Sequence, residues 1–452
     1  MPLRNLFSGW ATLPLFKKLE RTSALFLLLS TAMLPFRLGG TLESPTIKPS
    51  EVLFAIAIVL LLPVVMQRKF LLEVNEMRVL KNSVVACAAL FIALLIGTAT
   101  SFVVFRQLPF PLVPLEYARL IVAGCFFLLT IYHSSRIKIF PQILFATFAT
   151  SLIPALLGLY PGRNGLITIF SGGGSRLAGF LSDPNYFASI SIIALALFFS
   201  VALNKNISPT KRALAAISSI IMISAIWQSG SRSGWLGAIA CIGVCGLITI
   251  ARADKKIKAA AATALFALAI TVSGFLVLSG EQKTNTFART GYFLDFTNSE
   301  SSASQRAIAD MRNAIETQEA RLDQGQDRFN LWSRALPFIF VNPFGYGPGY
   351  YEITNIYNAG GAQQVVHSLP LEILLTGGAL GGLIFIVLLG LCAREMIKSR
   401  EPLAIGIAGA LVGILVSALF LDALSLRWLW VLMAIALSLN AYQGPQEATK
   451  DA

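Results

Sequence analysis

Long blocks of apolar residues alternate with short polar connections over most of the chain. Many of these blocks approach the ~20 residues that cross a bilayer as one helix. Lipid offers no hydrogen-bond partner to an exposed backbone group, so a helix is the structure expected for each block. The pattern predicts an all-α polytopic membrane protein with about 12 transmembrane helices, near residues 22–36, 51–67, 83–105, 113–132, 139–160, 185–203, 211–229, 233–251, 259–279, 368–393, 402–421 and 425–441.

The segment before the first span, Leu3–Leu19, is amphipathic, and we expect it to lie on the membrane surface. Lys17, Lys18 and Arg21 precede the first apolar block in the manner of a signal peptide. No small-residue cleavage pattern follows this block, so we interpret it as a membrane span.

Composition supports the membrane interpretation. Hydrophobic residues make up 55% of the 452 residues and charged residues only 13%, whereas a soluble chain carries about 25% charged residues. These values exclude an ordinary soluble enzyme, a disordered protein and a nucleic-acid binder, although the net charge is +13. All five cysteines lie in apolar blocks, so no disulfide framework is expected: Cys87, Cys125, Cys241, Cys245 and Cys392.

The distribution of lysine and arginine predicts the orientation of the spans. Every second connection is rich in these residues, and the positive-inside rule places such connections in the cytoplasm. Both termini are then cytoplasmic, which requires an even number of spans. The basic connections contain Lys17/Lys18/Arg21, Arg68/Lys69/Arg78/Lys81, Arg136/Lys138, Lys205/Lys211/Arg212, Arg252/Lys255/Lys256/Lys258 and Arg394/Lys398/Arg400.

One outer connection is much longer than the others and divides the chain into three parts. Residues 1–279 hold nine predicted spans, residues 280–367 form the outer loop, and residues 368–452 hold three spans and a tail. Within the loop, Ser302–Leu322 and Arg328–Phe340 are predicted to be helices. The next ten residues, 342–351, are rich in Gly, Pro and Tyr, which indicates turns near the lipid headgroups.

Four arginines are predicted at the outer face, where cations are uncommon. Arg176 precedes the sixth span and Arg232 lies in the turn between spans seven and eight, both in loops rich in Gly and Ser. Guanidinium groups suit the oxygens of phosphate, which at this surface would belong to a lipid or a lipid-linked pyrophosphate. Arg119, beside Glu116, and Arg427 are equally consistent with interface anchors or local ion pairs.

The glycine run Gly172–Gly174 beside Arg176 would let backbone N–H groups approach an anion. A flexible linker explains the run equally well, because it lacks the lysine and hydroxyl residue of a nucleotide-binding loop.

Only two histidines occur in the chain, and they are predicted on opposite faces. His133 ends the fourth span on the cytoplasmic side and is interpreted as an interfacial residue. His367 lies where the long outer loop enters the tenth span. A helix beginning near Ser368–Pro370 would place its positive end beside His367 and favour the neutral ring, which can accept a proton. A helix-capping role for His367 is the alternative.

The sequence offers no metal-ligand pattern. The two histidines cannot meet, and the outer carboxylates Asp295, Asp310, Glu316 and Asp327 lack ligand spacing. Neither a metal nor a cofactor is therefore expected. One general base and several fixed cations on one face suit group transfer from a phosphate leaving group.

Several segments together resemble the O-antigen ligase/polymerase family. They are RLAGFLSDPNYFA (176–188), SGSRSGWLGA (229–238), DRFNLWSRALPFIFVNPFGYGPG (327–349), HSLPLEILLTGGALGGLIF (367–385) and DALSLRWLW (422–430). The first 150 residues resemble the family only in being spans.

The resemblance implies a fold like the GT-C membrane glycosyltransferases, in the bacterial inner membrane, with a periplasmic active site. It implies metal-independent, inverting transfer from an undecaprenyl-pyrophosphate-linked glycan to an acceptor hydroxyl, on lipid A-core in a ligase. Arg176 matches the arginine of the R-x-x-G-x-x-x-x-x-N motif, which ends here at Asn185, and Arg232 matches the SR motif; both are expected to bind pyrophosphate. His367 is expected to be the base, although this chain has HS where many members have HN.

Further residues are candidates for the same cavity. Arg328 is expected to face the cavity, or else to be a surface charge of the loop helix. Asp183, Asn185, Arg119 and Arg427 are the other candidates. Membrane lipids are expected contacts.

Three alternative functions are consistent with the sequence. A polymerase of O-antigen or exopolysaccharide, or a protein O-oligosaccharyltransferase, would use the same site with another acceptor. An anion transporter is an alternative from another class, but it should show repeats and broken helices at the membrane centre, and the sequence shows neither. The third is a structural assembly subunit.

Overall fold

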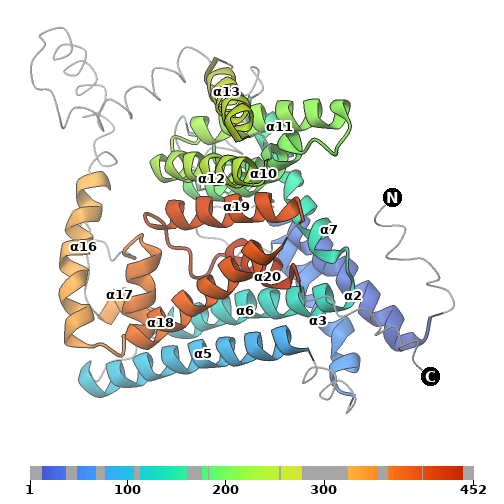
Figure 1. Ribbon diagram of the computed structural model, residues 1–452. Coiled ribbons are helices and arrows are strands. Elements are labelled where there is room, and N and C mark those ends of the chain that lie inside the picture. Colours follow the sequence, from blue (N-terminus) through green and yellow to red (C-terminus); the bar gives the residue numbers. More distant parts are fainter. Residues whose placement is uncertain are drawn as a thin grey trace, which may run out of the picture.

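The computed structural model describes residues 13–36, 48–67, 77–105, 112–159, 176–181, 183–253, 256–276, 324–353, 365–399 and 401–440. In this part of the chain the regular structure is helical and no strand occurs (Figure 1). The helices before the outer loop are α2 (Leu15–Ala32), α3 (Pro49–Val65), α5 (Arg78–Phe105), α6 (Leu112–Arg136), α7 (Phe140–Thr147), α8 (Leu152–Leu159), α10 (Pro184–Leu203), α11 (Pro209–Gln228), α12 (Arg232–Ala251) and α13 (Lys256–Leu276). The later helices are α16 (Gln324–Val341), α17 (Tyr350–Ile353), α18 (Leu369–Lys398), α19 (Leu403–Ala418) and α20 (Arg427–Ser438).

The chain is an all-α polytopic membrane protein. Among the described residues, 8 segments are long and apolar enough to cross a bilayer, judged by length and composition. Helical structure lies at each predicted span, but α3, α19 and α20 are shorter apolar helices, and α2, at the first predicted span, is not among the 8 segments. α2 begins at Leu15, so the end of the predicted surface segment Leu3–Leu19 belongs to the same helix as the first span.

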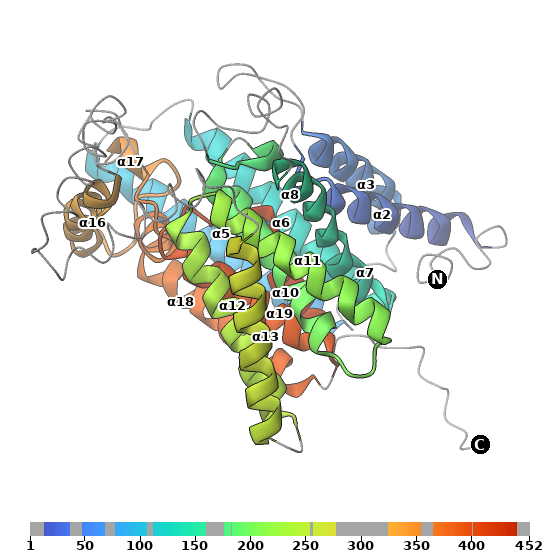
Figure 2. The same ribbon diagram turned by 90° about the horizontal axis from the view of Figure 1, so that it is seen from above.

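The spanning helices stack side by side, and α10 lies inside the stack (Figures 1 and 2). α10 packs against α11, α12 and α19, and most of its side chains are buried. α12 and α19 approach most closely at Gly237 and Gly413. A Cβ on Gly413 would lie 2.7 Å from the carbonyl oxygen of Gly237. Glycine is therefore needed at this crossing, as at many helix contacts in membranes.

The polar contacts between helix ends fall into two sets that match the predicted alternation of the spans. At predicted cytoplasmic ends, the Tyr132 hydroxyl donates to Glu20 at 2.9 Å and an Arg252 Nη2–H donates to the Ser399 carbonyl at 2.8 Å. At predicted outer ends, the Ser30 hydroxyl donates to the Ser50 carbonyl at 2.6 Å. None of these contacts joins a predicted inner end to a predicted outer end.

The fifth predicted span, 139–160, is not one continuous helix. It consists of α7, a 3₁₀ turn at Phe148–Ser151, and α8. Pro154 lies three residues after the end of the turn. Proline lacks the N–H for an α-helical bond, and its ring clashes with the carbonyl four residues before it. The local change to 3₁₀ geometry avoids this conflict.

α18 contains a break that the sequence interpretation did not predict. Gly378 has φ 64° and ψ −163° within this helix. The Tyr346 N–H donates to the Leu375 carbonyl at 2.6 Å, and the Gly347 N–H donates to the Thr376 carbonyl at 2.9 Å. The segment 342–349, which we expected near the headgroups, thus supplies the hydrogen bonds that the broken helix lacks.

His133, in the last turn of α6, is wholly buried by neighbouring helices, and its expected position at the membrane interface stays a prediction. Its Nε2 lies 3.3 Å from the hydroxyl oxygen of Ser23 on α2, and its ring lies against Phe140. The predicted outer-loop helix Arg328–Phe340 is confirmed as part of α16. The predicted helix Ser302–Leu322 and the run Gly172–Gly174 lie outside the described residues.

Candidate functional site

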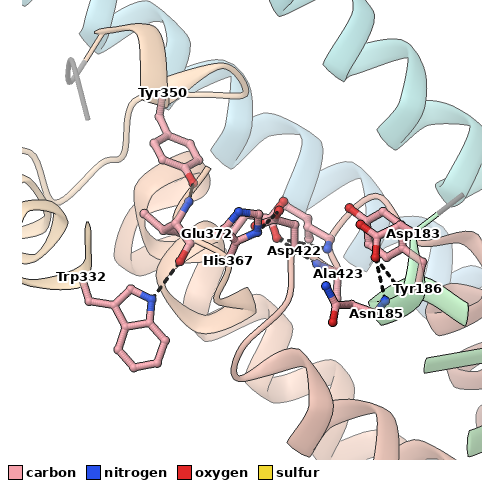
Figure 3. Close-up of polar contacts among 11 residues, drawn as sticks. Asp183, Asn185, Tyr186, Trp332, Tyr350, His367, Glu372, Asp422 and Ala423 are labelled. Atoms are coloured by element: carbon pink, nitrogen blue, oxygen red, sulfur yellow. Dashed lines mark hydrogen bonds and ion pairs between the residues drawn. The ribbon is translucent and has the colours of Figure 1, made fainter. Parts of the chain in front are cut away.

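The residue before His367 is held on both sides of its backbone by the outer loop. The Val366 N–H donates to the Tyr350 hydroxyl at 2.9 Å, and the Trp332 indole N–H donates to the Val366 carbonyl at 2.8 Å (Figure 3). Val366 and Tyr350 belong to a small apolar cluster with Leu331, Ala335, Tyr346 and Leu375. Two loop helices, α16 and α17, therefore fix the chain at the entrance to α18.

Burial raises the pKa of the Tyr350 hydroxyl, and the charges of Asp422 and Glu372 raise it further. The hydroxyl therefore stays protonated while its oxygen accepts the Val366 N–H.

His367 has φ 47°, in the left-handed region that a non-glycine residue seldom adopts. Such a conformation persists only where the surroundings enforce it, and it is common at active sites. Here the contacts to Val366 on one side and the start of α18 on the other enforce it. α18 begins at Leu369, two residues after His367, as predicted.

The His367 ring pairs with Asp422 in the connection between α19 and α20. Nδ1 lies 3.0 Å from Oδ2 of Asp422, whose side chain is 11% exposed. A carboxylate only accepts hydrogen bonds at neutral pH, so Nδ1 carries the proton and Nε2 presents its lone pair. Nε2 has no hydrogen-bond partner among the described residues, and the His367 side chain is 31% exposed. The pair therefore presents an oriented imidazole nitrogen, with its lone pair available, at the start of α18.

Sequence reasoning missed Asp422, the partner of the His367 ring. It occurs in the segment DALSLRWLW, which we quoted only for its resemblance. The Ser368 side chain, next to His367, makes no capping hydrogen bond at the start of α18.

Arg176 is fixed by its neighbours at the start of α10. Its Nε–H donates to the Ser229 carbonyl at 2.8 Å, and an Nη2–H donates to Oδ1 of Asn185 at 3.1 Å. Asp183 is the N-cap of α10, because its carboxylate accepts the N–H groups of Asn185 and Tyr186. Asp183 therefore has a structural role, and Asn185 aligns the guanidinium.

Arg232 is the first residue of α12, and its side chain is exposed. In the described part of the chain no ion pair or hydrogen bond involves its side chain. A cation is unfavourable at the positive end of a helix, whereas an anion is favoured there. Arg232 follows Ser229 by three residues, so Arg176 is bonded to the turn between α11 and α12 that leads to Arg232.

The start of α10 connects two regions. One is the turn between α11 and α12 near Arg176 and Arg232, and the other is the region of the His367–Asp422 pair. The Tyr186 ring packs edge-on against Trp428, at 6.3 Å between ring centres, and the Trp428 indole N–H donates to the Ser189 hydroxyl at 3.2 Å. Figure 3 shows the start of α10 beside the Asp422 connection. The convergence of Arg176, Arg232 and His367 on one cavity stays a prediction.

The remaining candidate arginines, Arg119, Arg427 and Arg328, lie in other surroundings than Arg176 and Arg232. Arg119 pairs with Glu116 one turn earlier on α6, and Arg427 pairs with Glu51 at the start of α3. Arg119 thus forms the local pair that the sequence allowed, whereas the partner of Arg427 lies 376 residues away in sequence. Arg328 lies in α16, but its side chain is outside the described residues.

Residues 217–386 match the O-antigen ligase family. This part of the chain is an O-antigen ligase domain. The match includes Arg232 and His367 but begins after Arg176 and ends before Asp422. No curated protein matches the chain. The O-antigen ligase domain indicates glycan transfer of the ligase or polymerase type, with glycan and lipid-linked substrates.

The O-antigen ligase domain contains His367, and its partner Asp422 lies 36 residues beyond the matched segment. No group of three or more His, Cys, Asp or Glu side chains that could bind a metal occurs in the described ranges. The chemistry that the site itself offers is acid–base catalysis by the histidine, together with electrostatic stabilisation by the arginines.

Proposed function

We propose that the protein transfers a glycan from an undecaprenyl-pyrophosphate-linked donor to an acceptor hydroxyl, with inversion and without a metal. The reaction takes place at the periplasmic face of the bacterial inner membrane, and both termini are cytoplasmic. Lipid A-core is the proposed acceptor, which makes the protein an O-antigen ligase.

His367 acts as the general base. Nε2 removes the proton from the acceptor hydroxyl, whose oxygen forms a bond to the anomeric carbon of the donor sugar. The bond from that carbon to the pyrophosphate oxygen breaks, and its electron pair leaves with undecaprenyl pyrophosphate. Attack from the face opposite the leaving group inverts the anomeric configuration. Asp422 maintains the tautomer in which Nε2 can accept the proton.

Arg176 and Arg232 stabilise the charge that develops on the departing pyrophosphate. A guanidinium group can bind two phosphate oxygens at once. The bonds from Arg176 to Ser229 and Asn185 fix its guanidinium before substrate binds, so little reorganisation is needed in the transition state.

The observation that carries the proposal is the oriented His367–Asp422 pair on a chain with an O-antigen ligase domain. A deletion strain tests the acceptor. Loss of the lipopolysaccharide ladder with accumulation of lipid-linked polysaccharide supports a ligase. Lipopolysaccharide that carries only single repeat units would instead indicate a polymerase, and an unchanged ladder with loss of glycan from a protein would indicate an O-oligosaccharyltransferase.

Purified enzyme tests the chemistry. Transfer from a purified lipid-linked glycan in detergent should proceed with excess chelator present. Loss of activity that returns with magnesium or manganese would contradict metal-independent transfer. Metal-independent transfer should also invert the anomeric configuration, which NMR of the product determines.

A further inference from the structure

Glu372 lies in the first turn of α18, five residues after His367, and the proposed mechanism does not use it. Ionisable side chains are costly inside membrane-spanning helices and usually have a specific role. Glu372 contacts the connection between α19 and α20, which lies 51 and 52 residues further along the chain.

One carboxylate oxygen of Glu372, Oε2, accepts two backbone hydrogen bonds. The N–H groups of Ala423 and Leu424 each donate to it at 3.2 Å. Ala423 and Leu424 are 0% and 2% exposed. A buried backbone N–H needs an acceptor, and this connection is not helical, so it cannot supply one from a helix ladder. Glu372 therefore satisfies two donors that would otherwise be buried without a partner.

The two N–H groups directly follow Asp422, whose carboxylate pairs with His367. α18 thus holds the same connection at two points, through the His367 ring at its entrance and through Glu372 in its first turn (Figure 3). These contacts close a ring through His367, Asp422, Ala423 and Glu372. The place of the Asp422 carboxylate relative to the imidazole depends on both points.

We propose that Glu372 is a positioning residue that aligns Asp422 with His367. Its function is to accept the two N–H groups rather than to supply negative charge. The proposal rests on the proposed function for its activity readout, while the hydrogen bond itself can be measured without activity.

Three variants separate these roles. Glu372→Gln keeps an oxygen that accepts both N–H groups and should retain turnover within about threefold of wild type. Glu372→Leu fills the space without an acceptor and should lower kcat at least tenfold, with donor binding unchanged. Glu395→Leu is the matched control at the other end of α18, where Glu395 bonds Asn440, and it should keep wild-type turnover.

A double-mutant cycle tests whether Glu372 acts through Asp422. In an Asp422→Asn background, Glu372→Leu should lower kcat by less than threefold, because the aligned group is already lost. Equal effects in the two backgrounds would show an independent role and overturn the proposal. An inactive Glu372→Gln variant that binds donor would overturn it too, by showing that the charge matters.

The chain has only two histidines, so ¹⁵N-histidine labelling gives two assignable rings. Glu372→Leu should change the His367 Nδ1 signal as Asp422→Asn does, while Glu372→Gln should leave it unchanged. If wild-type protein transfers no glycan, the proposed function fails. The ¹⁵N spectrum still decides whether Glu372 aligns Asp422 with His367. An unchanged His367 signal in folded Glu372→Leu protein would overturn the positioning role whatever the enzyme's activity.

Discussion

At the scale of single residues, the imidazole of His367 is oriented by Asp422 and its backbone is restrained through Val366. His367→Ala and His367→Gln should both abolish transfer, because neither side chain accepts a proton at neutral pH. General-base catalysis contributes roughly 10²–10⁴-fold in rate. Donor binding, measured separately, should remain, because the arginines are assigned to the pyrophosphate. An active His367→Gln enzyme would leave His367 a positioning residue only.

The role of Arg232 depends on the shape of its guanidinium as well as its charge. Arg232→Lys should be nearly as damaging as Arg232→Ala, because lysine loses the fork that binds two phosphate oxygens. The expected cost is on the order of 2.7–4 kcal/mol in the transition state. Arg252→Lys, at the other end of α12, is the control and should retain activity. Wild-type transfer by Arg232→Lys would show that charge alone suffices.

Tyr350 should affect catalysis without contacting substrate. Tyr350→Phe removes the acceptor of the buried Val366 N–H, which costs about 1–3 kcal/mol. We expect kcat to fall while donor binding persists, because His367 loses one restraint. Tyr346→Phe removes a hydroxyl of the same cluster, which donates to the Phe338 carbonyl. It should lower the melting temperature and spare turnover; an equal loss of turnover in both variants would indicate a general effect of stability.

The sequence indicated His367 but not the groups around it, for a physical reason. A single outer histidine at a predicted helix start is visible in one segment of sequence. Asp422 becomes its partner only because α18, α19 and α20 pack together, and they bring an aspartate 55 residues away to 3.0 Å from the ring. Nothing in the spacing of the two residues indicates the pair.

At the scale of secondary-structure elements, hydropathy predicted the existence of the spans because each is a long apolar block. The break in α18 was not predictable in this way, since glycine is common in membrane helices. Whether a glycine keeps helical geometry depends on what packs beside it. Here the segment 342–349 supplies the replacement hydrogen bonds from more than 25 residues away.

Gly378→Ala should destabilise the protein, because a side chain there is strained and its Cβ would overlap the Pro343 carbonyl. The strained conformation alone costs on the order of 1–3 kcal/mol. Gly390→Ala is the matched control in the same helix, where a Cβ meets no atom within 4 Å. Thermal unfolding in detergent should show a lower midpoint for Gly378→Ala only. Equal midpoints would mean that α18 is continuous in solution.

At the scale of the whole molecule, the two sets of contacts between helix ends support alternate crossings of one membrane, with the basic connections on one side. A cysteine replacing Asn206, in the exposed connection after α10, should react with an impermeant maleimide only after the inner membrane is permeabilised. A cysteine replacing Phe340, which is 82% exposed on α16, should react in intact spheroplasts. The opposite pattern would invert the orientation and place His367 in the cytoplasm.

The outer end of α5 has a consequence for how the protein is made. The hydroxyls of Thr100 and Ser101 donate to the carbonyls of Gly345 and Tyr346, which lie 245 residues later in each case. At a synthesis rate of about 5–20 residues per second, these acceptors emerge from the ribosome roughly 12–50 s after α5. For that interval the nascent α5 must remain in the bilayer without α18 and the segment that carries Gly345 and Tyr346. The last third of the chain therefore completes the packing of a helix from the first third.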